Sequence, residues 1–283
     1  MTEKHAIKPE QSIELLKELH ILTRDGKLNQ DSRRKLKQVN HLYQFIEPLL
    51  KELQQDHTDI TLVDHGAGKS YLGFILYDLF FKQQSGNFRV FGIETRDELV
   101  AKSRQLADKL RFPGMCFLNL SVAESIHSEA LPPTVDIVTA LHACDTATDD
   151  AIHFALHKKA RFIVLVPCCQ AEIAGVLRKN KAAALAANSL AELWRHPLHT
   201  REFGSTITNV LRCLQLEAHG YQVNVTELVG WEHSMKNELI IATYKDLPRR
   251  RPAERLHNLL DTLGLSEMNR RFFTPEHALT SSL

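Results

Sequence analysis

Two spacings of apolar residues alternate along the middle of the chain. Short runs rich in β-branched residues indicate buried strands, and the segments between them have apolar residues every three or four positions, which indicates amphipathic helices. We predict strands at residues 61–64, 89–94, 115–119, 135–141, 161–166, 222–228 and 238–244. We predict helices at residues 71–82, 97–110, 148–158, 181–193 and 206–219. This alternation is typical of a parallel sheet with helices on both faces.

Both ends of the chain are expected to be helical. Apolar residues with helical spacing occur at residues 13–22 and 36–53, where Pro48 is expected to bend the second helix, and again around Leu256 and Leu260. We therefore divide the chain into a helical N-terminal cap at residues 1–56, an α/β domain at residues 57–246 and a basic helical tail at residues 247–283.

The composition is that of an ordinary globular chain. Apolar residues make up 43% and charged residues 24% of the 283 residues, so the chain can bury a core and is not of the disordered class. The five cysteines are odd in number, residues 1–11 lack the apolar segment of a signal peptide, and no apolar run approaches the ~20 residues that cross a bilayer. We expect a cytoplasmic protein with reduced thiols and no membrane role.

Charge is concentrated locally rather than over the whole chain. The formal net charge of +1 gives no overall attraction to nucleic acid. Two clusters of cations could still bind phosphates: Arg33, Arg34, Lys35 and Lys37 in the first, and Arg249, Arg250, Arg251 and Arg255 in the second. The alternative for each cluster is a solvated basic helix face or tail.

A glycine turn joins the first predicted strand to the helix that follows. Gly66 and Gly68 can adopt positive φ, and the helix N-terminus offers unpaired N–H groups, so the turn can hold an anion or a carboxylate. A nucleotide-phosphate loop would need glycine at Val63, and a dinucleotide fingerprint would need a third glycine near Tyr71. Asp64, directly before the turn, instead suits a cofactor with a cationic amino group.

Glu94 ends the second predicted strand, at the place where cofactor ribose hydroxyls lie in open α/β sheets. We predict that its carboxylate binds those hydroxyls. The alternative is that Glu94 only caps the following helix. Thirty positions separate Glu94 from Asp64, and the long connection at residues 80–87 accounts for this separation.

Three motifs, in the same order, resemble those of a known methyltransferase-domain family. They are Asp-His-Gly-Ala-Gly-Lys-Ser-Tyr-Leu at residues 64–72, similar to its first motif, Leu-His-Ala-Cys-Asp-Thr-Ala-Thr-Asp at 141–149, similar to its Leu-His-x-Cys-Gly-x-x-Thr-Asp, and Pro-Cys-Cys at 167–169. Residues 35–40 are similar to a basic helix that precedes the domain in this family. The family includes tRNA ribose methyltransferase-like proteins and the methyltransferase region of a glutathione-transferase C-terminal-domain protein. The resemblance spans about residues 33–244 and departs at Asp145, where the family usually has glycine.

The resemblance implies an α/β, Rossmann-like class I methyltransferase with a mostly parallel seven-stranded sheet, whose methyltransferase domain is residues 57–246. The helix at 206–219, followed by two strands that can pair antiparallel, agrees with this sheet, because a dinucleotide dehydrogenase normally continues with a parallel strand. The implied cofactor is S-adenosylmethionine. We assign its binding to Asp64, His65, Gly66, Ala67, Gly68, Glu94, Ser121, Val122 and Leu141, with Ser121 and Val122 beside the adenine ring.

One histidine and three cysteines follow the fourth and fifth predicted strands. Ligands of open parallel sheets bind beyond the carboxyl ends of the strands. We therefore expect four side chains to lie together near the methyl group that is transferred, namely those of His142, Cys144, Cys168 and Cys169. These residues could hold zinc, although no Cys-x-x-Cys spacing occurs; a cysteine could attack a pyrimidine ring; or the cysteines could line the pocket while His142 acts as a base. We favour the last and predict no metal. Lys236, before the final strand, could reach substrate phosphate or the reacting hydroxyl.

These features together predict an S-adenosylmethionine-dependent methyltransferase that acts on RNA, with both basic clusters against the RNA backbone. Two alternatives stay open. One is a methyltransferase for a protein or small molecule, and the other is a non-catalytic Rossmann module that binds S-adenosylmethionine.

Overall fold

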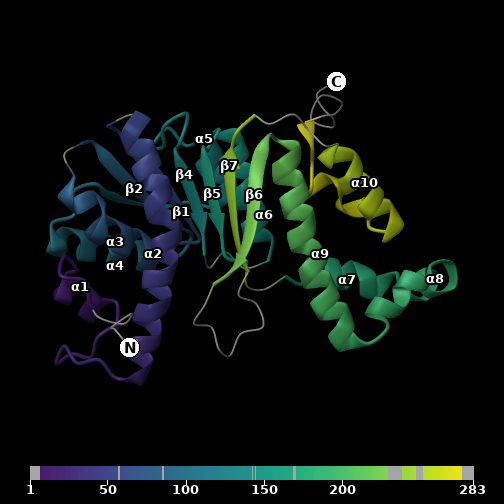
Figure 1. Cartoon of the computed structure of the whole chain (residues 1–283), viewed down its shortest axis with the longest axis horizontal. Helices are drawn as coiled ribbons and strands as arrows, with labels where there is room; N and C mark the ends of the chain where they lie inside the picture. The colour runs from purple at the N-terminus through teal and green to yellow at the C-terminus, as the bar shows by residue number, and fades with distance from the viewer. Residues whose placement is uncertain are drawn as a thin grey trace.

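A seven-stranded sheet forms the centre of the computed structural model, which describes residues 7–56, 58–84, 86–141, 143, 145–167, 170–228, 238–246 and 251–275 (Figure 1). Its strands are β1 Ile60–His65, β2 Phe88–Glu94, β3 Met115–Asn119, β4 Ile137–Ala140, β5 Phe162–Leu165, β6 Tyr221–Glu227 and β7 Glu238–Tyr244. Every strand lies within two residues of its predicted bounds. The buried apolar runs locate β1, β2, β4 and β5 well, because both faces of the sheet are covered at these strands.

The strand order indicates where a ligand can bind on the sheet. The order is β3-β2-β1-β4-β5-β7-β6, with parallel pairing throughout except for β7, which runs antiparallel to β5 and to β6. The chain moves outward from β1 to β3 and then returns to β4 on the other side of β1. Ligands bind at such a reversal, beyond the carboxyl ends of the strands. The α/β fold class and the antiparallel closing pair are both confirmed.

The helices are α1 Ile13–Glu18, α2 Gln30–Asp56, α3 Tyr71–Leu79, α4 Asp97–Leu110, α5 Val122–His127, α6 Thr146–His157, α7 Glu172–Lys179, α8 Lys181–Ala187, α9 Pro197–Ala218 and α10 Pro252–Thr262. Short 3-10 helices are η1 Phe81–Gln83, η2 Ser189–Trp194 and η3 Ser266–Arg270. Buried side chains of α2, α3 and α4 pack on one face of the sheet, and those of α5, α6 and α9 pack on the other. The sheet is thus covered on both faces, as the sequence pattern predicts.

The long helix α2 covers part of the first face and approaches the carboxyl ends of the strands (Figure 1). Its 27 residues include Pro48, and its buried stripe is formed by Leu36, Leu42, Tyr43, Ile46, Leu50 and Leu53. The helix begins at Gln30, six positions before the first apolar residue of the predicted segment. The basic residues at 33–37 therefore belong to its first turns.

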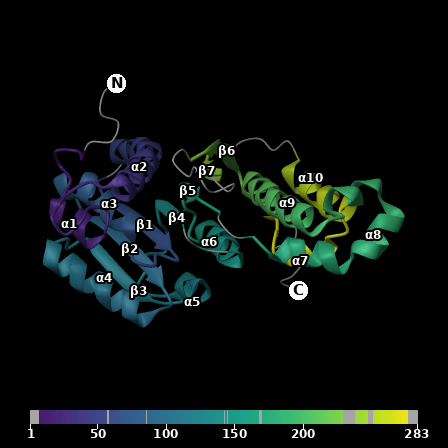
Figure 2. The same cartoon turned by 90° about the horizontal axis from the view of Figure 1, so that it is seen from below.

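A separate apolar core lies beside the sheet, where Figure 2 shows α7, α8, α9 and α10 grouped at one end of the molecule. Its fully buried members include Trp194, Leu211 and Leu260. The predicted helical spacing around Leu260 is confirmed, and α10 packs against α9 in this core. The division of the chain at residue 247 remains a prediction.

Candidate cofactor and active site

The turn between β1 and α3 is built on two glycines with positive φ. Gly66 has φ +62° and Gly68 has φ +57°. A Cβ atom at Gly66 would lie 3.3 Å from the Cα of Ala143, which follows β4. The N–H of Ala67 donates a hydrogen bond to the carbonyl of Ile93, 3.1 Å away on β2. The turn therefore lies close to the ends of both neighbouring strands, and glycine is required where it approaches Ala143.

Asp64 lies at the end of β1 and is 3% exposed. Its register partner on β4 is Thr139, whose hydroxyl donates a 2.7 Å hydrogen bond to the Asp64 carboxylate. Burial raises the pKa of Asp64 to about 7, and the hydrogen bond from Thr139 opposes that rise. A buried acid with an elevated pKa, at the reversal point of the sheet, is suited to pairing with a cationic group.

Glu94, at the end of β2, is bound to the glycine turn and to Arg96. The N–H of Gly68 donates a 2.9 Å hydrogen bond to Oε2 of Glu94, and the Arg96 guanidinium donates to both carboxylate oxygens at 2.9 and 3.2 Å. Burial raises the pKa of Glu94, but the hydrogen bonds from Arg96 and Gly68 outweigh this effect and leave its pKa below the usual value. The Arg96 side chain is 62% exposed. An ionised acceptor therefore lies beside the turn, paired with a largely exposed arginine.

Three other residues assigned to the cofactor, His65, Ser121 and Val122, are engaged in packing or helix capping. His65 is fully buried with its ring 4.4 Å from that of Phe154, and burial lowers its pKa to about 3. Ser121 is the N-cap of α5 and forms a capping box with Glu124. Val122 is half-buried against the core of the second face. The His65 ring therefore packs in the core as a neutral group, and the Ser121 hydroxyl is engaged in helix capping.

The residues predicted to act in catalysis lie outside the described residues. They are His142, Cys144, Cys168, Cys169 and Lys236. Their roles remain predictions. In the described part of the chain, no group of three or more His, Cys, Asp or Glu side chains is placed to hold a metal ion. No described helix is long and apolar enough to cross a membrane.

The residues next to His142 and Cys144 reveal a buried ion pair. Thr148 donates a hydrogen bond to the carbonyl of Ala143. Asp149 accepts hydrogen bonds from Nε and Nη2 of Arg212 at 2.7 and 2.8 Å, and both side chains are buried. Arg212 also donates to the carbonyl of Asp145 at 2.9 Å. The Thr-Asp end of the second motif therefore fixes the loop after β4 to α9.

Asp145 stands where the family usually has glycine, and its backbone and side chain show how this residue is accommodated. It has φ +52° and ψ −121°, a conformation that glycine adopts readily and other residues rarely adopt. Its carboxylate accepts hydrogen bonds from the N–H groups of Ala171 and Glu172 at 2.9 and 3.3 Å. The backbone thus keeps a glycine-like shape, while the Asp145 side chain connects the loop after β4 to the start of α7.

A buried polar network extends this connection to the loop after β5. Gln170 follows the Pro-Cys-Cys motif, and its amide nitrogen donates to Asn209 at 2.9 Å while its amide oxygen accepts from Ser205 at 2.8 Å. Asn209 in turn donates to Glu238 on β7 at 2.6 Å. Sequence reasoning missed this network and Arg212. The detectable signal was the spacing of polar residues at 205, 209 and 212, which places them on one face of α9.

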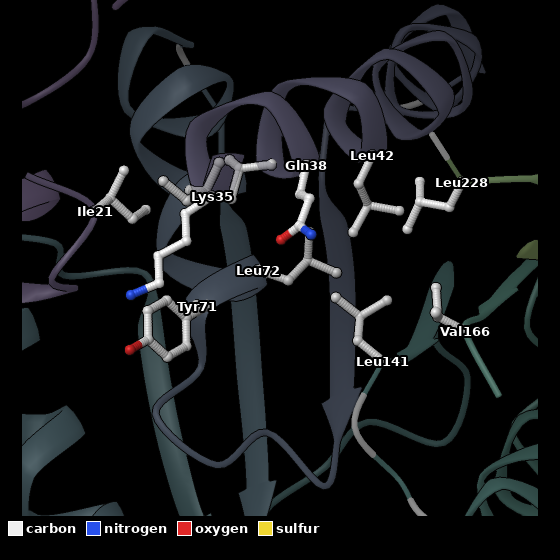
Figure 3. Close-up of a pocket in the computed structure, with 11 residues that line it drawn as sticks. Ile21, Lys35, Gln38, Leu42, Tyr71, Leu72, Leu141, Val166 and Leu228 are labelled. Carbon is white, nitrogen blue, oxygen red and sulfur yellow. The ribbon is translucent and has the colours of Figure 1, made fainter. Parts of the chain in front are cut away.

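A cavity of about 200 Å³ lies between α2 and the carboxyl ends of strands β4 and β5 (Figure 3). Tyr71 and Leu72, directly after the glycine turn, form one side, and Leu141, directly before His142, forms another. The other lining residues within the described part of the chain are Ile21, Lys35, Gln38, Val39, Leu42, Ile75, Val166 and Leu228. Leu141, assigned to the cofactor site, therefore borders this cavity.

Comparison with known proteins gives matches of two kinds. A family described as "Methyltransferase domain" matches residues 34–176. The Glutathione S-transferase C-terminal domain-containing protein of Mus musculus is 23% identical over 236 residues, which cover 77% of this chain and 34% of that protein. The corresponding Bos taurus protein is 22% identical with the same coverage. The chain thus spans about a third of the length of these curated relatives.

Solved structures of methyltransferases match this chain at low identity. A putative caffeoyl-CoA O-methyltransferase from Staphylococcus aureus is 11% identical, with 83% of this chain and 93% of that chain covered and a TM-score of 0.47. Magnesium protoporphyrin IX methyltransferase from Synechocystis PCC 6803 is 16% identical, with coverage of 82% and 93% and a TM-score of 0.44. The family match over residues 34–176 shows that this chain belongs to the methyltransferase domain family, whose methyl donor is S-adenosylmethionine.

Proposed function

We propose that this chain transfers a methyl group from S-adenosylmethionine to RNA. The cofactor supplies, when bound, a methyl group on a positively charged sulfur that an acceptor atom can attack. Such a transfer depends mainly on alignment of the two reactants. The proposal rests mainly on two features that lie toward the carboxyl ends of the strands. One is the glycine turn with Asp64 and Glu94, which suits the cofactor, and the other is the pair of exposed arginines in the first turns of α2.

The residues of the turn fit the cofactor. The Asp64 carboxylate suits the ammonium group of the methionine portion, because a buried anion gains most from a cationic partner. Gly66 and Gly68 leave space for a carboxylate to approach the backbone. Glu94 suits the two ribose hydroxyls, which would take the places of Arg96 on its oxygens. These groups bind and orient the donor, and the loops after β4 and β5 would position the acceptor.

The basic cluster on α2 supports RNA as the acceptor. Arg33 and Arg34 are exposed in the first turns of α2, close to Lys35, which lines the cavity. By contrast, Arg251 and Arg255 each lie near a glutamate, at 3.4 Å from Glu254 and 3.3 Å from Glu217 respectively. Figure 2 also shows α10 at the opposite end of the molecule from α2. The α2 cluster is therefore the better candidate for holding the phosphates beside the site.

Methyl transfer from radiolabelled S-adenosylmethionine to total RNA and to total protein tests the proposal. We expect label in RNA, with binding that weakens as salt rises, because phosphate contacts release counterions. The double variant Arg33→Ala/Arg34→Ala should reduce the slope of log K against log salt by about 0.7 per lost contact with single-stranded RNA. The matched control is Arg178→Ala/Lys179→Ala, which removes two exposed cations from α7. Label in protein alone would contradict the proposal and favour a protein methyltransferase.

The odd number of cysteines supports a reducing, cytoplasmic site of action as part of this proposal.

The candidate substrates differ in the cavity volume that they require. At about 200 Å³ the cavity is smaller than the roughly 300–1,000 Å³ sites that hold drug-sized ligands. A flat, ring-sized group is closer to this volume than a large macrocyclic acceptor.

A further inference from the structure

The cavity below α2 has the position expected of an acceptor pocket. It lies between the helix and the carboxyl ends of the strands, with Leu141 from the end of β4 and Val166 from the end of β5 pointing into it (Figure 3). Tyr71 borders it immediately after the glycine turn that we assign to the cofactor. A group that fills the cavity would therefore lie next to both segments that surround the donor.

We propose that this cavity holds the heterocyclic base of an RNA nucleotide and that the methyl group is transferred to that base rather than to its ribose. This proposal rests on the proposed function of RNA methylation. Of the eleven described residues that line the cavity, eight are aliphatic, among them Leu42, Leu141 and Val166. A ribose would lose hydrogen bonds from its hydroxyls against such walls, whereas the faces of a flat unsaturated ring would lose few.

The polar lining residues are suited to the edge of a base. Lys35, Gln38 and Leu42 are spaced three and four positions apart, so they share one face of α2. Figure 3 shows the Gln38 amide extending from α2 toward Leu72, and Lys35 and Tyr71 line the same cavity. An amide offers both donors and an acceptor, which is the combination presented by base edges. Gln38 is therefore the residue that we assign to recognition of the base.

Charge on the same helix supports a nucleotide over an uncharged aromatic ligand. Arg33 and Arg34 directly precede Lys35 and are exposed. Helix α2 presents apolar and amide groups to the cavity, and its guanidinium groups lie about one turn away. These two sets of groups suit the base and the phosphates of one nucleotide respectively. The base would enter the cavity, and its phosphates would stay outside against the arginines.

Three variants of α2 test the proposal. Val39→Phe adds a ring at the half-buried wall of the cavity, and Gln38→Ala removes the amide. The matched control, Gln44→Ala, changes an exposed glutamine of the same helix that does not line the cavity. Each variant is measured for S-adenosylmethionine affinity by calorimetry and for methyl transfer to RNA. Mass spectrometry of the digested RNA then locates the methyl group on base or ribose.

We expect a methylated base, a loss of at least about tenfold in kcat/KM for Val39→Phe and Gln38→Ala, and an unchanged Kd for S-adenosylmethionine in both. Unchanged cofactor binding shows that a variant is folded, and Gln44→Ala should behave as wild type. Methyl groups on ribose, or full activity in both cavity variants, would overturn the base assignment while leaving RNA methylation standing. No methyl transfer to RNA by the wild-type protein would overturn both.

Discussion

Replacement of Asp64 by asparagine should stabilise the protein in the absence of cofactor. Asp64 is 3% exposed, and burial raises the pKa of its carboxyl from 3.8 to about 7. The unfolded chain releases this proton near its ordinary pKa, while the folded protein keeps it until about pH 7. This difference destabilises the folded state progressively between those values, and the cost reaches roughly 4 kcal/mol above pH 7. Asparagine has the same shape, cannot ionise and can still accept the hydrogen bond from Thr139.

Urea unfolding of wild type and Asp64→Asn across a pH series measures this effect. The variant should be the more stable protein at about pH 8, and its advantage should shrink by roughly 2–3 kcal/mol as the pH falls to about 5. The sign follows from the raised pKa, since stability from the protonated carboxyl is present at low pH and lost as pH rises. A variant that is less stable than wild type at about pH 8, or an advantage that does not change with pH, would refute the reasoning.

Three further substitutions test packing, two of them at the site and one in the separate core beside the sheet. Arg212→Met leaves Asp149 as a buried charge without its bidentate partner, and we expect a loss of about 3–5 kcal/mol in urea unfolding, part of which Asp149→Asn should restore in the double variant. Gly66→Ala places a Cβ 3.3 Å from Ala143 at positive φ, so it should cost about 1–3 kcal/mol and weaken cofactor binding in calorimetry. Trp194→Ala should cost about 3–5 kcal/mol in thermal unfolding, because Trp194 is fully buried in the core beside the sheet. An effect below about 1 kcal/mol at any of these positions would contradict the assigned contact.

Sequence patterns located the strands better than the helices. All seven strands lie within two residues of their predicted bounds, because short runs rich in apolar and β-branched residues stand out between polar segments. Short and mixed helices were located less well. The predicted helix at 206–219 begins instead at Pro197, and the predicted helix at 181–193 is divided where Asn188 leaves the helical conformation. The short helices α5 and α7 were missed, since six or eight residues carry too little periodicity.

In the candidate site, residues that belong to local sequence patterns were predicted, and residues that depend on contacts distant in the sequence were not. Asp64, Gly66 and Glu94 stand out in the sequence because a strand end, a glycine turn and an acidic residue form local patterns. Arg212 and Gln170 carry no such pattern, since their partners lie on other elements and pair with them only after the chain has folded. The burial of the His65 ring against Phe154 is likewise a result of packing between β1 and α6.

Titration calorimetry with S-adenosylmethionine tests most directly whether the glycine turn and Glu94 form the donor site. We expect saturable binding to the wild-type protein and at least about tenfold weaker binding to Glu94→Ala and Asp64→Asn, a loss of about 1.4 kcal/mol or more in each. Absence of binding at millimolar S-adenosylmethionine, or wild-type affinity in both variants, would contradict this account.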